Sequence, residues 1–409
     1  MSVNTDPKKI DWFLNHGVQA VLPEQGKVLR ERMLKGERLR AYLGIDATGP
    51  SVHIGHAISA QKLGEWQALG HEAILLLGDF TGMIGDPTDK TAARTRLTRE
   101  QTLENLKDYK TQLSKILRFD GENPVQIRFN SEWLGKMSFA DVVELAAHFT
   151  VQQMMERDMF EKRLAENKPI FLQEFLYPLM QGQDSVALDV DLEIGGNDQT
   201  FNMLAGRTLM REISGKEKAV MTCRLLTDPT GKKMGKTEGN MIALSDAPED
   251  AYGKMMSWPD TMILPGFEIL TSLTGDLEKE AEAIAERRDR VTDEPMALKK
   301  ELAEQVVRWG YGDEAATQAA AHFASVHQEG AMPEMITEIF VNTSPMLVVD
   351  ALTESGLVAS KTDARRQIEQ GAVKVEGVVV TDVKAEMDVS AEGVVLQKGK
   401  RGFAKLIKR

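Results

Sequence analysis

The sequence predicts an α/β protein of two or three domains, with a parallel sheet near its N-terminus and a small basic module at its C-terminus. Its 409 residues exceed what a single simple domain usually holds. Because 42% of the residues are hydrophobic and 27% are charged, the composition is that of a globular chain able to bury a sizeable core. Strand and helix patterns alternate between residues 40 and 79, as in a parallel α/β sheet.

The first predicted unit is strand, helix, strand. Residues 40–46 and 73–79 are short apolar runs that end in Gly or Asp, and we interpret both as strands. Between them apolar residues recur at helical spacing from about residue 56, and Gly70 is the expected helix C-cap. This order implies two parallel strands joined by a right-handed crossover.

The elements that follow are mostly helical. A long amphipathic helix is predicted over 98–119, beginning with a capping box formed by Thr98 and Gln101. The pattern then predicts further elements in this order: a strand at 123–130, helix throughout 131–185, a buried strand at 190–196, helices over 245–330, a connector at 331–345 and a final module at 346–409.

Composition and charge narrow the function classes. The chain has one cysteine, Cys223, which we interpret as a small apolar residue of a strand; a single thiol forms no internal disulfide, which fits the cytoplasm. No stretch is long enough to span a membrane, and the N-terminus lacks a signal-peptide core. The net charge is −12, but residues 346–409 hold 11 Lys and Arg against 9 Asp and Glu. A basic tail on an acidic body suggests a localised anionic partner.

A tetrapeptide with two histidines, His53-Ile54-Gly55-His56, follows the first predicted strand. This position is the carboxyl end of a parallel strand and the beginning of a helix, where α/β sheets bind ligands and where helix N–H groups favour anions. An imidazole there can hydrogen-bond a phosphate oxygen. The pattern also fits an ordinary helix start with two surface histidines, and without a further Cys or His cluster it does not predict a zinc site.

A lysine-rich loop, residues 225–240, is the second candidate. Its turn-forming residues and Lys232, Lys233 and Lys236 suit a mobile cationic loop that closes on a transferring phosphate, although a solvated loop has the same composition. Thr230 stands where a Walker P-loop requires glycine, which excludes that motif.

Two more segments carry polar candidates. Residues 78–96 are rich in glycine after a strand and contain Asp86, Lys90 and Arg94. Tyr177, Gln181 and Asp184 stand at i, i+4 and i+7, so they share one face of a helix. Polar residues aligned on one face suggest the wall of a polar pocket, and a solvated face is the alternative.

Taken together, these motifs resemble those of bacterial tyrosyl-tRNA synthetases, which are class I enzymes, over nearly the whole chain. The resemblance rests on "HIGH" at 53–56, "KMGKT" at 233–237, "YPLMQGQD" at 177–184 and "IGGNDQ" at 194–199. Residues 355–380 resemble an S4 RNA-binding module. The resemblance implies a Rossmann-like catalytic domain over 1–240 with a helical dimerisation insertion at about 131–185, a helical anticodon-binding domain over 241–330 and an S4-like α+β domain over 346–409.

The resemblance also implies a reaction and the residues that serve it. Tyrosine would be activated by ATP, with Mg²⁺ bound through the phosphates and no metal ligand in the protein, and then transferred to tRNA(Tyr). The implied catalytic residues are Thr48, His53, His56, Lys90, Arg94, Lys233, Lys236 and Thr237. ATP would contact Gly44, Thr48, His53, Gly55, His56, Gly196, Asp198 and Lys236. The α-ammonium of tyrosine would bind Asp86, Tyr177 and Gln181, and its phenol would bind Tyr42 and Asp184.

For partners, the resemblance implies a homodimer through the helical insertion and tRNA contacts from Arg365, Arg366, Lys400 and Arg401. An internal helix pair is the alternative for residues 131–185. Rival functions are a tryptophanyl-tRNA synthetase, an adenylyltransferase of the phosphopantetheine type, and a synthetase-derived RNA chaperone. The Tyr42 and Asp184 pair favours tyrosine, and the intact histidines and lysines favour retained catalysis.

Overall fold

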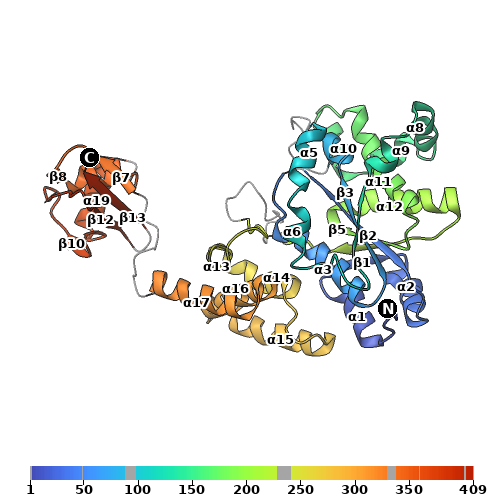
Figure 1. The fold of residues 1–409 in the computed structure, drawn as a ribbon, viewed down its shortest axis with the longest axis horizontal. Coiled ribbons are helices and arrows are strands. Elements are labelled where there is room, and N and C mark those ends of the chain that lie inside the picture. The colour runs from blue at the N-terminus through green and yellow to red at the C-terminus, as the bar shows by residue number, and fades with distance from the viewer. Residues whose placement is uncertain are drawn as a thin grey trace. The chain divides into compact units, whose positions relative to one another are not determined.

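The computed structural model describes residues 2–47, 49–87, 98–227, 241–328, 338–358, 360–399 and 402–408. The chain divides into two compact units, Met1–Ala316 and Thr317–Arg409 (Figure 1). Within the described ranges, no helix is long and apolar enough to cross a membrane.

The first unit is built on a six-stranded sheet. Its strand order is β1–β6–β5–β2–β3–β4, and every pairing is parallel except that of β1 with β6. The predicted strand–helix–strand unit is confirmed, because β2 pairs in parallel with β3 and α3 connects them. The strands are β1 (Val18–Leu22), β2 (Arg40–Asp46), β3 (Glu72–Gly78), β4 (Gln126–Phe129), β5 (Leu192–Gly196) and β6 (Ala219–Cys223).

The order of the strands reverses at β2. The chain adds β3 and β4 on one side of β2, and then returns to add β5 and β6 on the other side. In open parallel sheets a ligand crevice forms outside the carboxyl ends of the strands at such a switch point. Here those ends are Asp46 of β2 and Gly196 of β5. The fold therefore predicts a ligand site at the loops that follow these two residues.

Helices cover both faces of the sheet. β3 is buried along six of its seven positions, as expected for a strand covered on both faces. α11 and α12 pack against one another beside the sheet (Figure 1). Gly70 has φ of +90° just after α3, so it ends that helix as predicted. These helices are α1 (Pro7–Asn15), α2 (Lys27–Leu34), α3 (Ile54–Ala68), α4 (Thr81–Ile84), α11 (Leu172–Leu188) and α12 (Thr200–Leu209).

The single helix predicted over 98–119 is wrong, since the structure has two shorter ones, α5 (Arg99–Leu106) and α6 (Tyr109–Leu113). The capping box of Thr98 and Gln101 is present at the start of α5. The break lets buried side chains of α6 bond to the loop before α3. The hydroxyl of Tyr109 donates to the carbonyl of Gly49 at 2.6 Å, and Gln112 donates to that of Pro50 at 3.0 Å.

Residues 131–185 are mostly helical but are not one continuous helix. Ser138 and Thr150 cap new helices through side-chain bonds to backbone N–H groups, which divides the segment. The helices before α11 are α7 (Ser131–Leu134), α8 (Phe139–Ala146), α9 (Val151–Met155) and α10 (Asp158–Ala165).

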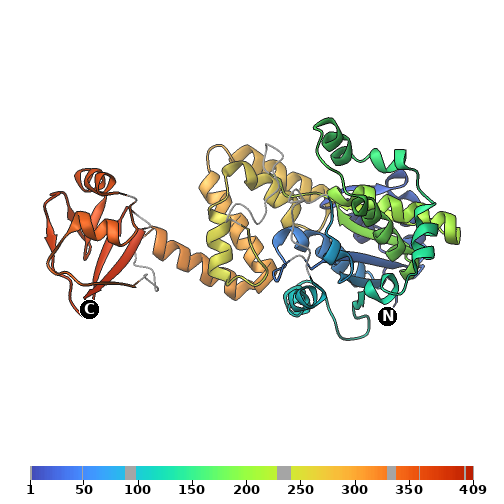
Figure 2. The same cartoon turned by 90° about the horizontal axis from the view of Figure 1, so that it is seen from above.

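The helical prediction for residues 245–330 is confirmed over the part that the structure describes. The first four of these helices gather into one body, yellow to orange in Figure 2. Leu298 and Leu302 of α16 and Phe267 of α14 lie in its buried core. The helices are α13 (Pro248–Met256), α14 (Ile263–Leu270), α15 (Leu277–Arg290), α16 (Pro295–Tyr311) and α17 (Asp313–Gln328).

The second unit contains a helix pair and a five-stranded sheet with the order β10–β9–β12–β13–β7. β7 pairs in parallel with β13, so residues 338–341, which the sequence analysis assigns to the connector, form a strand of this sheet. Its elements are β7 (Glu338–Val341), α18 (Val348–Glu354), α19 (Lys361–Glu369), β9 (Val373–Val375), β10 (Val378–Val380), β12 (Val394–Lys398) and β13 (Gly402–Lys408), with a separate short pair of β8 (Met346–Leu347) and β11 (Glu386–Met387).

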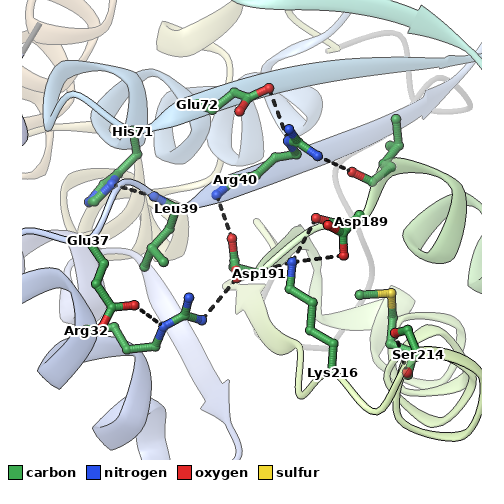
Figure 3. Close-up of polar contacts among 12 residues, drawn as sticks. Arg32, Glu37, Leu39, Arg40, His71, Glu72, Asp189, Asp191, Ser214 and Lys216 are labelled. Carbon is green, nitrogen blue, oxygen red and sulfur yellow. Dashed lines mark hydrogen bonds and ion pairs between the residues drawn. The ribbon is translucent and has the colours of Figure 1, made fainter.

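A charged cluster ties the amino ends of the strands in the first unit together (Figure 3). One carboxylate oxygen of Asp191 accepts from Arg32 Nη1 at 3.0 Å and the other from the backbone N–H of Arg40 at 2.9 Å. Lys216 lies 3.4 Å from Asp191 and also bonds Asp189. This cluster lies at the edge of the sheet opposite the crevice, so it serves the fold rather than the crevice.

Candidate active site

The two histidines sit at the beginning of α3. His53 is the N-cap, and its Nδ1 accepts from the backbone N–H of Gly55 at 3.1 Å. His56 Nδ1 accepts from the backbone N–H of His53 at 3.3 Å, and the two rings stack with centroids 3.8 Å apart. Because Nδ1 accepts in both rings, a neutral ring carries its proton on Nε2. The helix start therefore fixes the tautomer as well as the position of both imidazoles.

Gly55 leaves room for the His53 ring. A Cβ atom at this position would lie 2.9 Å from Cε1 of His53 and 3.0 Å from its Nδ1. A side chain would therefore push the His53 ring away from the helix start. The glycine of the histidine motif has a steric reason in the fold.

The segment that follows the lysine-rich loop contacts this helix start. The backbone N–H of Ile54 donates to the carbonyl of Ile242 at 2.9 Å, and that of Leu244 donates to Val52 at 2.8 Å. Residues 242–244, the stem of the loop, are therefore hydrogen-bonded to the backbone on both sides of His53. The predicted loop residues Lys232, Lys233, Lys236 and Thr237 lie outside the described residues, as do Thr48, Lys90 and Arg94.

Asp46 ends β2 at the switch point and accepts two hydrogen bonds. Thr81 Oγ1 donates to Oδ1 at 2.7 Å, and Tyr177 Oη donates to Oδ2 at 2.8 Å. Burial raises the pKa of Asp46 to about 6, although both hydrogen bonds favour the ionised form. A Cβ on Gly78 would lie 2.0 Å from Asp46 Oδ1, so only glycine leaves room for this carboxylate.

Asp86 lies next to this group. Gln199 donates to one of its carboxylate oxygens at 2.6 Å, and Arg157 donates to the other at 3.3 Å. The pKa of Tyr177 is raised well above its ordinary value by burial and by the nearby charges of Asp46, Asp86 and Asp184. Tyr177 thus stands among three carboxylates, an environment that suits a bound cation.

Tyr42 of β2 is buried against Gln181 and Ser185 of α11. The Tyr42 hydroxyl is 3.1 Å from Ser185 Oγ and 3.4 Å from the carbonyl of Gln181. The side-chain amide of Gln181 donates to Glu193 Oε1 at 2.9 Å. Burial raises the pKa of Tyr42, so the phenol stays protonated.

Asp184 completes the wall formed by α11. Trp133 Nε1 donates to its Oδ1 at 2.7 Å, and Asn130 donates to its Oδ2 at 3.3 Å. Burial is the largest cause of an Asp184 pKa raised well above the ordinary value, against the effect of these two donors. Tyr177 and Asp184 therefore belong to one set of hydrogen bonds, which runs through Asp46, Thr81 and Asn130, whereas Gln181 bonds Glu193 in a second set.

Two glycines lie near the carboxyl ends of β2 and β5. Gly44 is exposed in the middle of β2, on the same face as buried Tyr42 and as Asp46. At the end of β5, a Cβ on Gly196 would lie 2.5 Å from Oδ1 of Asp198. Gly196 thus leaves room for the Asp198 carboxylate, whereas a Cβ on Gly44 would meet only the Tyr42 ring at 3.8 Å, so the backbone at Gly44 is open to close approach.

Sequence reasoning missed several members of this site. Asp46 and Gln199 stand beside predicted residues but also look like ordinary turn residues. Trp133 and Asn130 belong to a segment that we interpreted only as helical. Glu193 is a charged residue within a buried strand, which is a usable signal.

The chemistry available here is recognition rather than covalent catalysis. Buried carboxylates can accept from an ammonium and a hydroxyl, while imidazole N–H groups and the start of α3 can contact an anion. The one thiol, Cys223 of β6, is buried, and burial raises its pKa to about 11, so it is an inert residue of a strand as predicted. Among the described residues, no group of three or more His, Cys, Asp or Glu could hold a metal ion.

Residues 34–328 match the family model of class I tRNA synthetases for W and Y, and residues 329–406 match that of a tyrosine–tRNA ligase SYY-like C-terminal domain. A tyrosine–tRNA ligase of Moorella thermoacetica is 43% identical over 397 residues, covering 96% of this chain and 94% of that protein. The chain belongs to the tyrosine–tRNA ligase family of class I synthetases. A second family member, from Thermotoga maritima, is 40% identical and covers 92% of both chains.

Solved structures of tyrosyl-tRNA synthetases share the fold over about three quarters of this chain. A C-terminally truncated mitochondrial tyrosyl-tRNA synthetase of Coccidioides posadasii has a TM-score of 0.59 and 25% identity, covering 77% of this chain and 91% of that one. The Archaeoglobus fulgidus tyrosyl-tRNA synthetase complexed with L-tyrosine also has a TM-score of 0.59, at 22% identity, and covers 77% of this chain and all of that one. The predicted class I α/β fold is thereby confirmed.

Proposed function

We propose that this chain is an ATP-dependent tyrosine–tRNA ligase. In the first step, the carboxylate of L-tyrosine attacks the α-phosphorus of ATP, which forms tyrosyl-adenylate and releases pyrophosphate. In the second step, a ribose hydroxyl of the terminal adenosine of tRNA(Tyr) takes the tyrosyl group and AMP leaves. Neither step needs a protein nucleophile, so positioning and charge stabilisation supply the catalysis.

The observation that carries the tyrosine assignment is the position of Tyr177 among Asp46, Asp86 and Asp184. The ammonium of the substrate would bind near Asp86, Tyr177 and Gln181. Its phenol would extend toward Tyr42 and Asp184. Since Asp184 already accepts from Trp133, a substrate hydroxyl would complete its hydrogen bonds, whereas phenylalanine would leave a buried carboxylate oxygen without that donor.

ATP would lie over Gly44 and Gly196, with its ribose near Asp198. His53 and His56 would donate from Nε2 to its phosphates, together with Thr48. Lys233, Lys236 and Thr237 would close over the leaving pyrophosphate, assisted by Lys90 and Arg94. The support is that the stem of the lysine loop is bonded to the backbone beside His53. Mg²⁺ would enter on the phosphates and neutralise their charge, as is usual for this ion.

We assign the homodimer contact to the helical insertion. Large apolar side chains are exposed on this segment, and Phe139 is 83% exposed. Sedimentation velocity should give a dimer for the wild type and a monomer for Phe139→Asp; a monomeric wild type would contradict the assignment. The exposed apolar residues of the segment are Phe139, Val143, Val151, Leu164, Phe171 and Leu172.

tRNA(Tyr) would contact the C-terminal module through its phosphates. Arg365 and Arg366 are exposed on α19, whereas Ala364 and Ile368 of the same helix are buried. Lys400 and Arg401, which lie outside the described residues, would extend this basic surface. The helical region of 241–330 would face the anticodon. The cytoplasm stays the predicted location.

Aminoacylation tests the whole assignment. Purified protein is incubated with ATP, Mg²⁺ and radiolabelled tyrosine, and with transcripts of tRNA(Tyr) or tRNA(Trp). Charging of tRNA(Tyr) alone is expected. Charging of tRNA(Trp) with tryptophan in parallel assays would contradict the specificity for tyrosine and favour a tryptophanyl-tRNA synthetase. Binding of tRNA without charging would favour the RNA-chaperone function.

A further inference from the structure

A lysine and a glutamate form a fully buried ion pair behind the pocket wall. Lys218 precedes β6 and is 0% exposed, and Glu193 of β5 is 2% exposed. The Lys218 ammonium donates to Glu193 Oε2, to Ser185 Oγ at 2.8 Å and to the carbonyl of Met203 at 3.1 Å. All three of its protons therefore have an acceptor.

The fold makes room for this pair at some cost. A Cβ on Gly206 of α12 would lie 2.5 Å from Lys218 Nζ and 2.6 Å from Ser185 Oγ. Burying two charges is also unfavourable, and apolar side chains of similar volume can often stabilise a core equally well. The pair thus calls for an explanation beyond stability, and its neighbours supply one.

Both remaining contacts of the pair lead to predicted tyrosine-binding residues. Glu193 Oε1 accepts from the side-chain amide of Gln181 at 2.9 Å. Glu193 Oε2 also accepts from Ser185 Oγ at 3.2 Å, and that hydroxyl lies 3.1 Å from the hydroxyl of Tyr42. The pair therefore bonds Gln181 directly and reaches Tyr42 through Ser185.

The donor and acceptor roles in these hydrogen bonds determine how the Gln181 amide and the Ser185 hydroxyl are oriented. Paired with the Lys218 ammonium, the Glu193 carboxylate accepts from the NH₂ end of the Gln181 amide, and a flip of that amide would bring two oxygens together. The oxygen of that amide is then the end left for a bound ammonium. The Ser185 hydroxyl donates its proton to Glu193, so its oxygen accepts from both Lys218 and the Tyr42 hydroxyl.

We propose that Lys218 and Glu193 are positioning residues of the tyrosine site, which fix the amide orientation of Gln181 and anchor the Tyr42 hydroxyl through Ser185 without touching the substrate. Lys218 holds the Glu193 carboxylate in place, and the two oxygens of that carboxylate position the two pocket residues. This inference rests on the proposed function and extends it to residues of β5 and the loop before β6.

The test is Glu193→Gln, measured as ATP–pyrophosphate exchange at varied tyrosine and varied ATP. A glutamine has the same size but can present either end of its amide to Gln181, so the fixed orientation is lost. We expect KM for tyrosine to rise by about tenfold or more, with KM for ATP within about twofold of the wild type, since one charged hydrogen bond in a buried site is at stake. An unchanged KM for tyrosine would overturn the positioning role.

A second variant guards against simple destabilisation. Glu193→Gln combined with Lys218→Met leaves no uncompensated charge, so it should fold even if the single variant does not. The double variant should keep the raised KM for tyrosine. Recovery of the wild-type KM together with recovered stability would reduce the pair to a structural role.

Asp191→Asn is the matched control. Asp191 directly precedes β5 and pairs with Arg32 at the opposite edge of the sheet (Figure 3). It should lower the unfolding midpoint but leave KM for tyrosine unchanged; an equal rise in KM would show that any lost ion pair on this strand has the same effect. A wild type that gives no exchange with tyrosine would contradict the proposed function itself, and this result is distinct from variants that keep the wild-type KM.

Discussion

Trp133 Nε1 donates a hydrogen bond to Oδ1 of Asp184 at 2.7 Å, and this carboxylate is only 3% exposed. The contact joins α7, the short helix after β4, to the pocket wall on α11. A residue at one edge of the sheet thus holds the carboxylate to which we assign the substrate phenol. The position of the Asp184 carboxylate, which would accept from the substrate hydroxyl, therefore depends on the hydrogen bond from Trp133.

Trp133→Phe should weaken tyrosine activation. The variant leaves a buried carboxyl group without one of its donors, which costs about 1–3 kcal/mol, so kcat/KM for tyrosine should fall by about 10- to 100-fold. Trp258→Phe is the matched control, because the buried indole N–H of Trp258 has no partner in the described part of the chain. Equal losses in the two variants would show that indole volume, and not the hydrogen bond to Asp184, is what matters.

Asp184→Ala should damage the use of tyrosine far more than the use of phenylalanine. The carboxylate can pair with a phenolic hydroxyl, which phenylalanine lacks. Pyrophosphate exchange with each amino acid, at saturating ATP, measures the two effects. An equal loss for both amino acids would remove Asp184 from the phenol site.

Gly55→Ala should slow the activation step with little effect on tyrosine binding. The new methyl group would collide with the His53 ring, whose Cε1 lies 2.9 Å from the position of the added carbon. A displacement of about 1 Å of a group near the reacting phosphates can lower the rate by about 10²-fold. Single-turnover formation of tyrosyl-adenylate checks the rate, and calorimetric titration with tyrosine checks binding. A wild-type rate would mean that the position of His53 is not critical.

Asp46 should give the stability of the protein a specific pH dependence. Its pKa is raised from 3.8 to about 6 by burial, so the folded state holds this proton more tightly than the unfolded chain. The resulting stabilisation is present at low pH and is lost as the pH rises through 6. Relative to Asp46→Asn, the wild type should lose about 1.4 kcal/mol of unfolding free energy between pH 5 and pH 8. Urea unfolding at several pH values measures the difference, and parallel curves would contradict the raised pKa.

Arg365→Glu should separate the two steps of the reaction. Arg365 is exposed on α19 of the C-terminal unit, so the substitution should raise KM for tRNA(Tyr) and leave tyrosine-dependent exchange unchanged. The dependence of log K on log salt for tRNA binding should fall in slope by about 1 if the side chain contacts one phosphate. Glu354→Gln, at the end of α18, is a control on the same module. An unaltered salt slope for Arg365→Glu would exclude that phosphate contact.

The sequence was most informative where local rules and the fold agree. The bounds of β2 and the capping box at Thr98 follow from apolar runs and capping chemistry, and the structure has both. The helix predicted over 98–119 is broken before Tyr109, whose hydroxyl bonds the loop at Gly49, a tertiary contact that hydrophobic periodicity does not report.

The same limit applies to the site. Motifs pointed to Tyr177, Gln181 and Asp184 because their spacing places them on one helix face. Glu193, by contrast, gains its meaning only from Lys218, which is 25 positions away in sequence and 0% exposed in the fold. Pairing between distant buried charges is set by strand order, which the sequence pattern alone does not specify.

The most direct measurement is ATP–pyrophosphate exchange without tRNA, carried out with tyrosine, tryptophan and phenylalanine at equal concentrations. The account predicts exchange with tyrosine and none above background with the other two, because only tyrosine offers both an ammonium for the site around Tyr177 and a hydroxyl for Asp184. Exchange with tryptophan would keep the ATP site but contradict the assigned pocket. No exchange with any of the three would contradict the central claim that this chain activates tyrosine.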